Sequence, residues 1–129
     1  MATKGLAALV GKPVVDPMGI EIGYVQGVDD RFLHLHEGGL ILGRRFVDRV
    51  IDKVVVRGRW QDLLSGMNVV DNAGEFVGIV KDTVDEDYAL RSLVLEDEEG
   101  EQITVPRDSL HAIDDWIELQ VSQGDLYEG

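Results

Sequence analysis

The chain contains one twelve-residue pattern twice, and this repetition limits its possible folds more than any other feature. The stretch "VVDPMGIEIGYV" begins at Val14, and "VVDNAGEFVGIV" begins at Val69. The aspartate, both glycines and the last valine match at one constant offset, 71 − 16 = 55. A chain of 129 residues is one ordinary domain or two very small ones. The repetition therefore predicts two small units of one kind.

Each copy of the pattern predicts a β-hairpin. Paired valines favour strands, and the "DPMG" from Asp16 to Gly19 is typical of a type I turn. The aspartate accepts hydrogen bonds from backbone N–H groups, the proline fits the fixed φ of the second position, and a glycine closes the turn. Asp71 and Gly74 bound the second turn in the same way, without a proline.

Gly23 and Gly78 lie inside the strands that follow these turns. A glycine weakens a strand unless the backbone has to bend or bulge there. Small barrels need such bends at their corners. The two glycines therefore predict a strongly curved sheet in each unit.

The segments further along each unit also repeat in order. "RRFVDRVID" precedes the strand "KVVVRG", and "PRDSLHAID" precedes "DWIELQV". Ile51 aligns with Ile113 at an offset of 62, so the second unit carries 62 − 55 = 7 extra residues. We expect units at 6–58 and 66–122, a linker at 59–65 and a flexible tail at 123–129. The predicted class is all-β, with two tandem small barrels or curved sheets that have short helical turns. The two units either share strands or pack as two barrels, and we expect two barrels that meet across a pseudo-two-fold axis.

The composition is strongly acidic, with a net charge of −13, 15 aspartates against 10 glutamates, and 8 arginines against 4 lysines. Such a chain suits a salty cytoplasm, where ions screen its self-repulsion. We therefore expect a halophilic or salt-tolerant archaeal source. The acidity argues against wrapping of nucleic acid, which needs clustered lysine and arginine. The absence of cysteine excludes a disulfide framework and thiol chemistry.

The charge differs between the two halves. Residues 1–65 hold 9 basic and 8 acidic groups, and residues 66–129 hold 3 basic and 17 acidic groups. The difference is either drift among solvated side chains, or a sign that the two halves face different neighbours. No apolar run approaches the ~20 residues that span a bilayer. The opening residues are too short for a secretory signal, so we expect a cytoplasmic location.

The order of these motifs resembles the PRC-barrel family. The resemblance is carried by "GKPVVDPMGIEIGYVQGV", "GMNVVDNAGEFVGIVKDTV" and "VPRDSLHAIDDWIEL". It covers nearly all of residues 9–121, although the first unit lacks the proline of the helical turn. Members of this family serve in a photosynthetic reaction-centre subunit, in a ribosome maturation factor and as small stand-alone archaeal proteins. The stand-alone type fits best and implies a non-catalytic adaptor, with a link to cell division or membrane-proximal assembly.

A cluster of arginines beside a tryptophan is the strongest candidate for a binding surface. Arginine and tryptophan are enriched at interface hot spots. The candidates for contact with a partner are Arg44, Arg45, Arg49, Arg57, Arg59 and Trp60. Three uses stay open: ion pairing with the acidic second unit, binding of a partner or a second copy, and binding of nucleic acid. Trp116 aligns with Val54, so we expect it in the core, with use at an interface as the alternative.

Other candidate chemistry is weak. His34 and His36 lie two apart on one strand face and could share a metal ion with His111 or Glu37. The acidic runs "VDEDY" and "EDEEGE" lack the ligand spacing of a calcium loop and are typical of solvated turns. No nucleophile motif or phosphate loop is present.

These observations predict a protein that is not an enzyme and needs no cofactor. We expect a protein partner and a homodimer. A factor for ribosome or RNA maturation is the first alternative, and a sensor of metal or a small ligand is the second.

Overall fold

The computed structural model describes residues 8–35, 40–50, 52–87 and 89–128. Over these ranges the chain forms strands joined by turns and a few short helices. The prediction of an all-β fold with short helical turns is confirmed.

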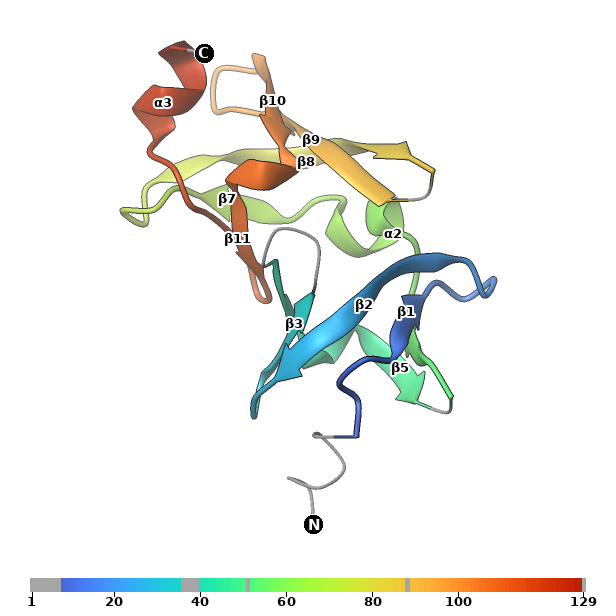
Figure 1. Cartoon of the computed structure of the whole chain (residues 1–129). Helices are drawn as coiled ribbons and strands as arrows, with labels where there is room; N and C mark the ends of the chain where they lie inside the picture. Colours follow the sequence, from blue (N-terminus) through green and yellow to red (C-terminus); the bar gives the residue numbers. More distant parts are fainter. Residues whose placement is uncertain (1–7, 36–39, 51, 88, 129) are drawn as a thin grey trace.

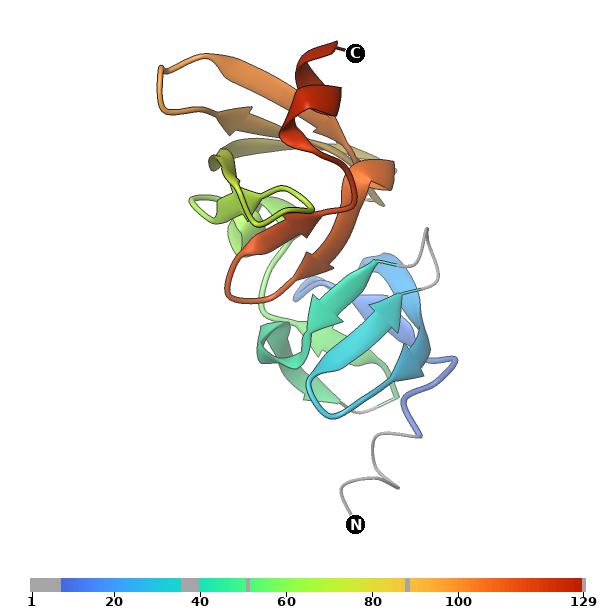
Figure 2. The same cartoon turned by 90° about the vertical axis from the view of Figure 1, so that its left-hand side faces the viewer.

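Within its described residues, the first unit contains six strands and one short helical turn. They are β1 (Pro13–Val15), β2 (Glu21–Val28), β3 (Phe32–Leu35), β4 (Ile41–Gly43), the 3-10 helix η2 (Arg44–Phe46), β5 (Val47–Val50) and β6 (Val54–Val56). Strand β1 pairs antiparallel with β2 and parallel with β6. Strand β3 lies between β2 and β4, and β5 lies beside β6. The strands curl around a shared interior, as Figures 1 and 2 show.

The second unit repeats this order. Its elements are helix α2 (Trp60–Leu64), β7 (Asn68–Val70), β8 (Phe76–Glu86), β9 (Ala89–Glu96), β10 (Gln102–Pro106), the 3-10 helix η3 (Arg107–Ser109), β11 (Leu110–Ile113), β12 (Ile117–Leu119) and helix α3 (Gln123–Glu128). Strand β7 pairs antiparallel with β8 and parallel with β12, as β1 pairs with β2 and β6. In Figure 1 this unit is the upper lobe of the molecule.

Equivalent backbone hydrogen bonds fix the alignment of the two units. The bond from Gly11 N to Val25 O corresponds to the bond from Gly66 N to Val80 O, at an offset of 66 − 11 = 55. Near the end of each unit, the bond from Arg57 N to Phe46 O corresponds to the bond from Gln120 N to Ser109 O, at an offset of 120 − 57 = 63. The offset of 62 expected for the last strands is therefore wrong by one position. The second unit carries 63 − 55 = 8 extra residues, and they lengthen its β8–β9 and β9–β10 hairpins.

The two Asp-x-x-Gly stretches form the same turn. One oxygen of Asp16 accepts the N–H groups of residues 18 and 20 at 2.9 and 3.0 Å, and Asp71 accepts the equivalent pair at 2.9 Å. Gly19 and Gly74 have φ angles of +86° and +84°, a conformation that costs other residues about 1–2 kcal/mol. Both aspartates are buried, and in each of them one carboxylate oxygen is satisfied inside the turn.

The structure contains a third copy of this turn in the β9–β10 hairpin. Asp97 accepts the N–H groups of Glu99 and Glu101 at 2.9 Å, and Gly100 has a φ of +84°. The "DEEG" of this segment satisfies the same pattern. Sequence analysis predicted a solvated turn at these residues, but it did not identify this turn as a third copy of the Asp-x-x-Gly motif.

The hydrophobic core is mainly aliphatic, with Phe46 and Trp60 as its aromatic members, and it is continuous through both units. Leu33 and Leu42 of the first unit and Leu93 and Ile113 of the second are fully buried. A small unit of this kind buries too little surface to be very stable alone. The shared core therefore supplies burial that neither unit has by itself.

Strand β4 of the first unit pairs in parallel with β11 of the second, with Ile41 opposite Ala112 and Leu42 opposite Ile113. This pairing joins all twelve strands in the order β10-β9-β8-β7-β12-β11-β4-β3-β2-β1-β6-β5. A pseudo-two-fold axis would also pair β10 with β5, because these strands are the counterparts of β4 and β11. Since β10 and β5 stand at opposite ends of the sheet, the expected pseudo-two-fold contact is wrong.

Two segments outside the expected units are helical. Residues 60–64 of the expected linker form α2, and residues 123–128 of the expected flexible tail form α3. Helix α2 packs against β8. Among the described residues, no helix has both the length and the apolar character that crossing a membrane requires.

Replacement of Gly78 by alanine tests the close packing of the curved sheet. A β-carbon on Gly78 would lie 2.7 Å from the carbonyl oxygen of Glu96, and a backbone atom cannot turn away. We expect Gly78→Ala to lower the free energy of unfolding by about 1–3 kcal/mol in urea denaturation. Gly27→Ala is the matched control, because its β-carbon would come no nearer than 3.9 Å to His34. Equal losses in the two variants would contradict the prediction.

We predict that the attachment of α3 depends on pH through the carboxylate of Asp71. Hydrogen bonds from the backbone N–H groups of Glu75 and then of Gln123 hold the pKa of Asp71 below its usual value. Because the folded-state pKa is the lower one, the ionised carboxylate stabilises the fold above about pH 4, and this contribution is lost as the pH falls through the folded-state pKa. Amide exchange of Gln123, corrected for its intrinsic rate, should accelerate on acidification.

The variant Asp71→Asn is the control for this experiment, since its amide does not titrate, its single oxygen can close the turn, and its nitrogen cannot accept the Gln123 N–H at any pH. Its Gln123 protection, corrected in the same way, should stay constant between about pH 3 and about pH 6. The same acid-induced loss of protection in Asp71→Asn and in the unaltered protein would show that other groups control α3.

Candidate interaction site at the seam between the two units

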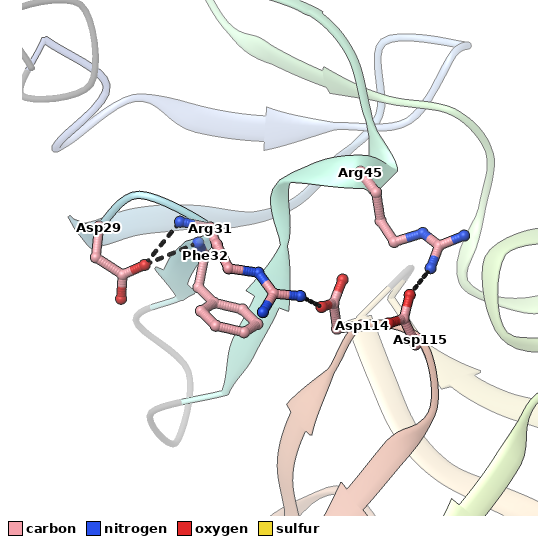
Figure 3. Close-up of polar contacts among 6 residues, drawn as sticks. All are labelled: Asp29, Arg31, Phe32, Arg45, Asp114 and Asp115. Atoms are coloured by element: carbon pink, nitrogen blue, oxygen red, sulfur yellow. Dashed lines mark hydrogen bonds and ion pairs between the residues drawn. The ribbon is translucent and has the colours of Figure 1, made fainter. Parts of the chain in front are cut away.

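Two ion pairs flank the β4–β11 pairing, and together with these strands they form what we call the seam. Arg31 Nη2 donates to Asp114 Oδ2 at 2.9 Å, and Arg45 pairs with Asp115. Figure 3 shows both arginines reaching from the first unit to the aspartates of the second. The arginines are more than half exposed, so each pair is worth only about 0.2–1 kcal/mol. Their main effect is to orient the side chains around the seam.

Asp29 prepares the turn that presents Arg31. Its Oδ1 accepts the N–H groups of Arg31 and Phe32 at 3.0 and 2.9 Å, and its Oδ2 lies 3.0 Å from His34 Nε2. The hydrogen bond with His34, and after it the one from the Arg31 backbone, hold the pKa of Asp29 below its usual value. The Arg31 guanidinium lies 5.5 Å from the centre of the Phe32 ring. The ionised carboxylate thus holds the backbone from which both side chains extend at the edge of the seam (Figure 3).

Gly43, the last residue of β4, lets the two units approach closely. A β-carbon on Gly43 would lie 3.2 Å from the Asp114 β-carbon and still closer to its carboxylate. Any side chain at this position would push the carboxylate away from Arg31. Glycine is therefore required by the approach of Asp114, and its own φ of −62° is an ordinary one.

Arg59 and Trp60, two of the predicted partner-binding residues, lie where the units are connected. Arg59 Nε is 3.3 Å from Asp16 Oδ2, in a carboxylate that is 1% exposed. Trp60 begins α2 and is 2% exposed. As placed, Trp60 contributes to the core, and Arg59 ties α2 to the first unit.

The other predicted arginines do not gather into one surface. Arg44 donates to the carbonyl oxygen of Asp30 at 3.0 Å, and Arg57 donates to that of Arg45 at 2.8 Å. Arg49 lies 3.8 Å from Asp48 on the same strand. Most of these side chains are thus engaged within the first unit, whereas Arg45 pairs with an aspartate of the second unit.

Trp116 stands in the turn between β11 and β12 and is 52% exposed, so its expected place in the core is wrong. The reason is the true offset, which makes the turn residue Lys53, and not the buried Val54, its counterpart (116 − 63 = 53). With the offset of 63, the sequence alone would have aligned Trp116 with a turn residue and predicted its exposure. With the offset of 62, that prediction could not be made.

A hollow of about 220 Å³ opens beside Trp116, and we call it the Trp116 hollow. It is lined from both units, by Arg31, Phe32, Asp114, Asp115, Trp116 and Glu118. Glu118 is half-buried, and within the described ranges it has no ion-pair partner. Sequence analysis missed Phe32 and Glu118, because only the pairing of the units brings them together.

The histidine candidates are only partly described. His34 contacts Asp29, while His36 and Glu37 lie outside the described residues. His111 is exposed on β11. In the described part of the chain, no group of three histidine, aspartate or glutamate side chains is arranged to hold a metal ion.

Comparison with known proteins gives one family match. The model of the PRC-barrel domain matches residues 61–126, which are 66 of the 129 residues and comprise the second unit with most of α2 and α3. No curated protein sequence matches the chain. Among solved structures, a 16S ribosomal RNA processing protein, RimM, from Pseudomonas aeruginosa is similar over 50% of this chain and 44% of its own, at 14% identity and a TM-score of 0.42.

The chain thus spans less than half the length of that protein, and so low a TM-score gives the likeness no weight for function. The family match covers half of the chain and falls on the unit whose curved strands, Asp-x-x-Gly turns and closing strand β12 have just been described. The chain belongs to the PRC-barrel domain family, as the resemblance of its sequence predicted.

Proposed function

We propose that the protein is a non-catalytic interaction module, an adaptor, which binds a partner protein in the Trp116 hollow. The observation that carries this proposal is the half-exposed Trp116 beside a carboxylate, Glu118, that lacks an ion-pair partner in the described part of the chain. Tryptophan and arginine side chains dominate the binding energy of many interfaces. Here Trp116 and Arg31 line one hollow, which is built from both units.

The chemistry of the hollow favours a basic segment of the partner. A lysine or arginine side chain would stack on the Trp116 ring, a contact worth about 0.5–2 kcal/mol. Its charge would meet Glu118, while Asp114 and Asp115 keep their pairs with Arg31 and Arg45. Residues 66–129 carry a net charge of 3 − 17 = −14, and this field would speed the approach of a basic partner.

The engaged arginines weigh against a polyanion as the ligand. Arg44, Arg45 and Arg57 bind oxygen atoms within the chain, so they offer a phosphate backbone less free charge than the sequence suggests. The archaeal cytoplasm, the link to division or membrane-proximal assembly, and the homodimer stay predictions of the sequence.

A peptide-display selection against the purified protein tests the proposal. We expect the enriched peptides to carry lysine or arginine, and their Kd to rise about tenfold or more for Trp116→Ala. Glu118→Gln should raise the Kd about two- to fivefold at low salt, and this effect should shrink in high salt because ions screen the pair. Met18→Ala is the control, since Met18 is 76% exposed on a turn of the first unit.

The proposal has three ways to fail in this experiment. Enriched peptides could bind Trp116→Ala as well as the unaltered protein. Acidic peptides could be enriched in place of basic ones. A library that contains basic peptides could also yield no binder at all, and each of these results contradicts the proposed site.

A further inference from the structure

The two strands that end the sheet are the counterparts of the two strands that pair in the seam. Strand β10 occupies in the second unit the place that β4 has in the first, and β5 occupies the place of β11. Within the described sheet, β10 has only β9 as a neighbour and β5 has only β6. Each outer edge therefore has the shape of one half of the seam.

A second copy of the chain is the partner that these edges fit. The seam joins unlike strands, and a contact of that kind repeats from one molecule to the next until a ring closes or a filament grows. Repeated between molecules, it would set β10 of one chain beside β5 of the next. At the offset of 63, Thr104 would face Arg49 and Val105 would face Val50. Val50 is 42% exposed and available for such a contact.

We infer that β5 and β10 form a latent copy of the seam, and that Pro106 and Asp108 keep it from forming between two copies of the chain. Both residues occupy positions whose counterparts in the first unit help to form the seam. Pro106 takes the place of Gly43, and Asp108 takes the place of Arg45.

Pro106 removes a hydrogen-bond donor from the outer edge of β10. In the first unit the Arg44 N–H donates to Arg31 on the β3 side, so the Gly43 N–H, one residue earlier, points to β11. In the second unit the Asp97 N–H donates to Glu101 inside the β9–β10 hairpin. The same alternation places the Pro106 nitrogen outward, where it has no hydrogen. Proline at an outward position of an edge strand is a known protection against further pairing.

Asp108 replaces an attraction by a repulsion. In the seam Arg45 pairs with Asp115, and the counterpart of Asp115 is Asp52, which is exposed. Asp108 of one chain would thus face Asp52 of the next. Two like charges as close as an ion pair repel each other and oppose contact. Phe32 pairs with Gly43 as Ser92 pairs with Pro106, so the offset between β3 and β9 is 92 − 32 = 60 and Arg91 is the counterpart of Arg31. Arg91 pairs with Glu86 at 3.2 Å and is thus drawn away from this edge.

Because of these two replacements, the chain does not assemble into rings or filaments through β5 and β10. The inference concerns these two edges and goes beyond the proposed binding site, which lies at the seam. Protection of these edges does not prevent a homodimer that forms through another face of the molecule.

The double variant Pro106→Gly/Asp108→Arg restores the missing donor and the missing cation. Since Pro106 lies at an outward position, the β9–β10 ladder keeps its bonds. Arg49→Cys and Thr104→Cys are added to the full-length chain as reporters, because the sequence has no cysteine of its own and paired strands bring two such positions within disulfide range. After mild oxidation we expect a ladder of covalent oligomers, with at least about tenfold more cross-linked product than without the double variant.

Pro106→Gly/Glu98→Arg is the matched control, because it changes the charge equally but at an exposed turn residue away from the edge. It keeps the repulsion between Asp108 and Asp52, so it should give clearly less cross-linked product than the double variant. Asp108→Arg without the proline change should give an intermediate yield, and it serves if the double variant does not fold by circular dichroism. Two results would overturn the inference: the reporters alone already give the ladder, or the folded variants with arginine at 108 give no more product than the control.

Discussion

The parallel pairing of β4 with β11 is the interaction on which the rest of this structure depends. It converts two curved six-stranded units into one sheet and one continuous core. Each unit alone is of a size at which burial barely offsets conformational entropy. The pairing also brings Arg31 within reach of Asp114 and builds the hollow around Trp116 from both units. Stability and the proposed binding surface thus have a common origin.

Local structure in both units rests on one turn, and its second carboxylate oxygen shows how a repeated motif is adapted. In each unit the first oxygen of the aspartate closes the turn. The second oxygen of Asp71 accepts the backbone N–H of Gln123 at the start of α3. The second oxygen of Asp16 instead lies beside the Arg59 side chain at the start of α2. The same turn therefore anchors the next helix by two different groups.

Divergence between the two units gives each copy of an equivalent position its own role. Lys53 and Trp116 occupy equivalent turns in the two units, yet of these two residues only Trp116 lines the hollow at the seam. Gly43 allows close approach at the seam, while Pro106 shields the corresponding edge. The two copies of the unit therefore differ at their edges: β4 and β11 pair in the seam, and β5 and β10 remain at the two ends of the sheet.

The sequence by itself determined the curved β-units, because the Asp-x-x-Gly turns and the alternation of apolar residues are local and act through neighbouring backbone groups. It also pointed to the PRC-barrel family. The tertiary structure alone decided which strands join the units, the exposure of Trp116, the burial of Trp60 and the meeting of Phe32 with Glu118. These depend on strand pairings between positions far apart in the chain, such as Ile41 and Ala112, and no local propensity selects one such pairing over another.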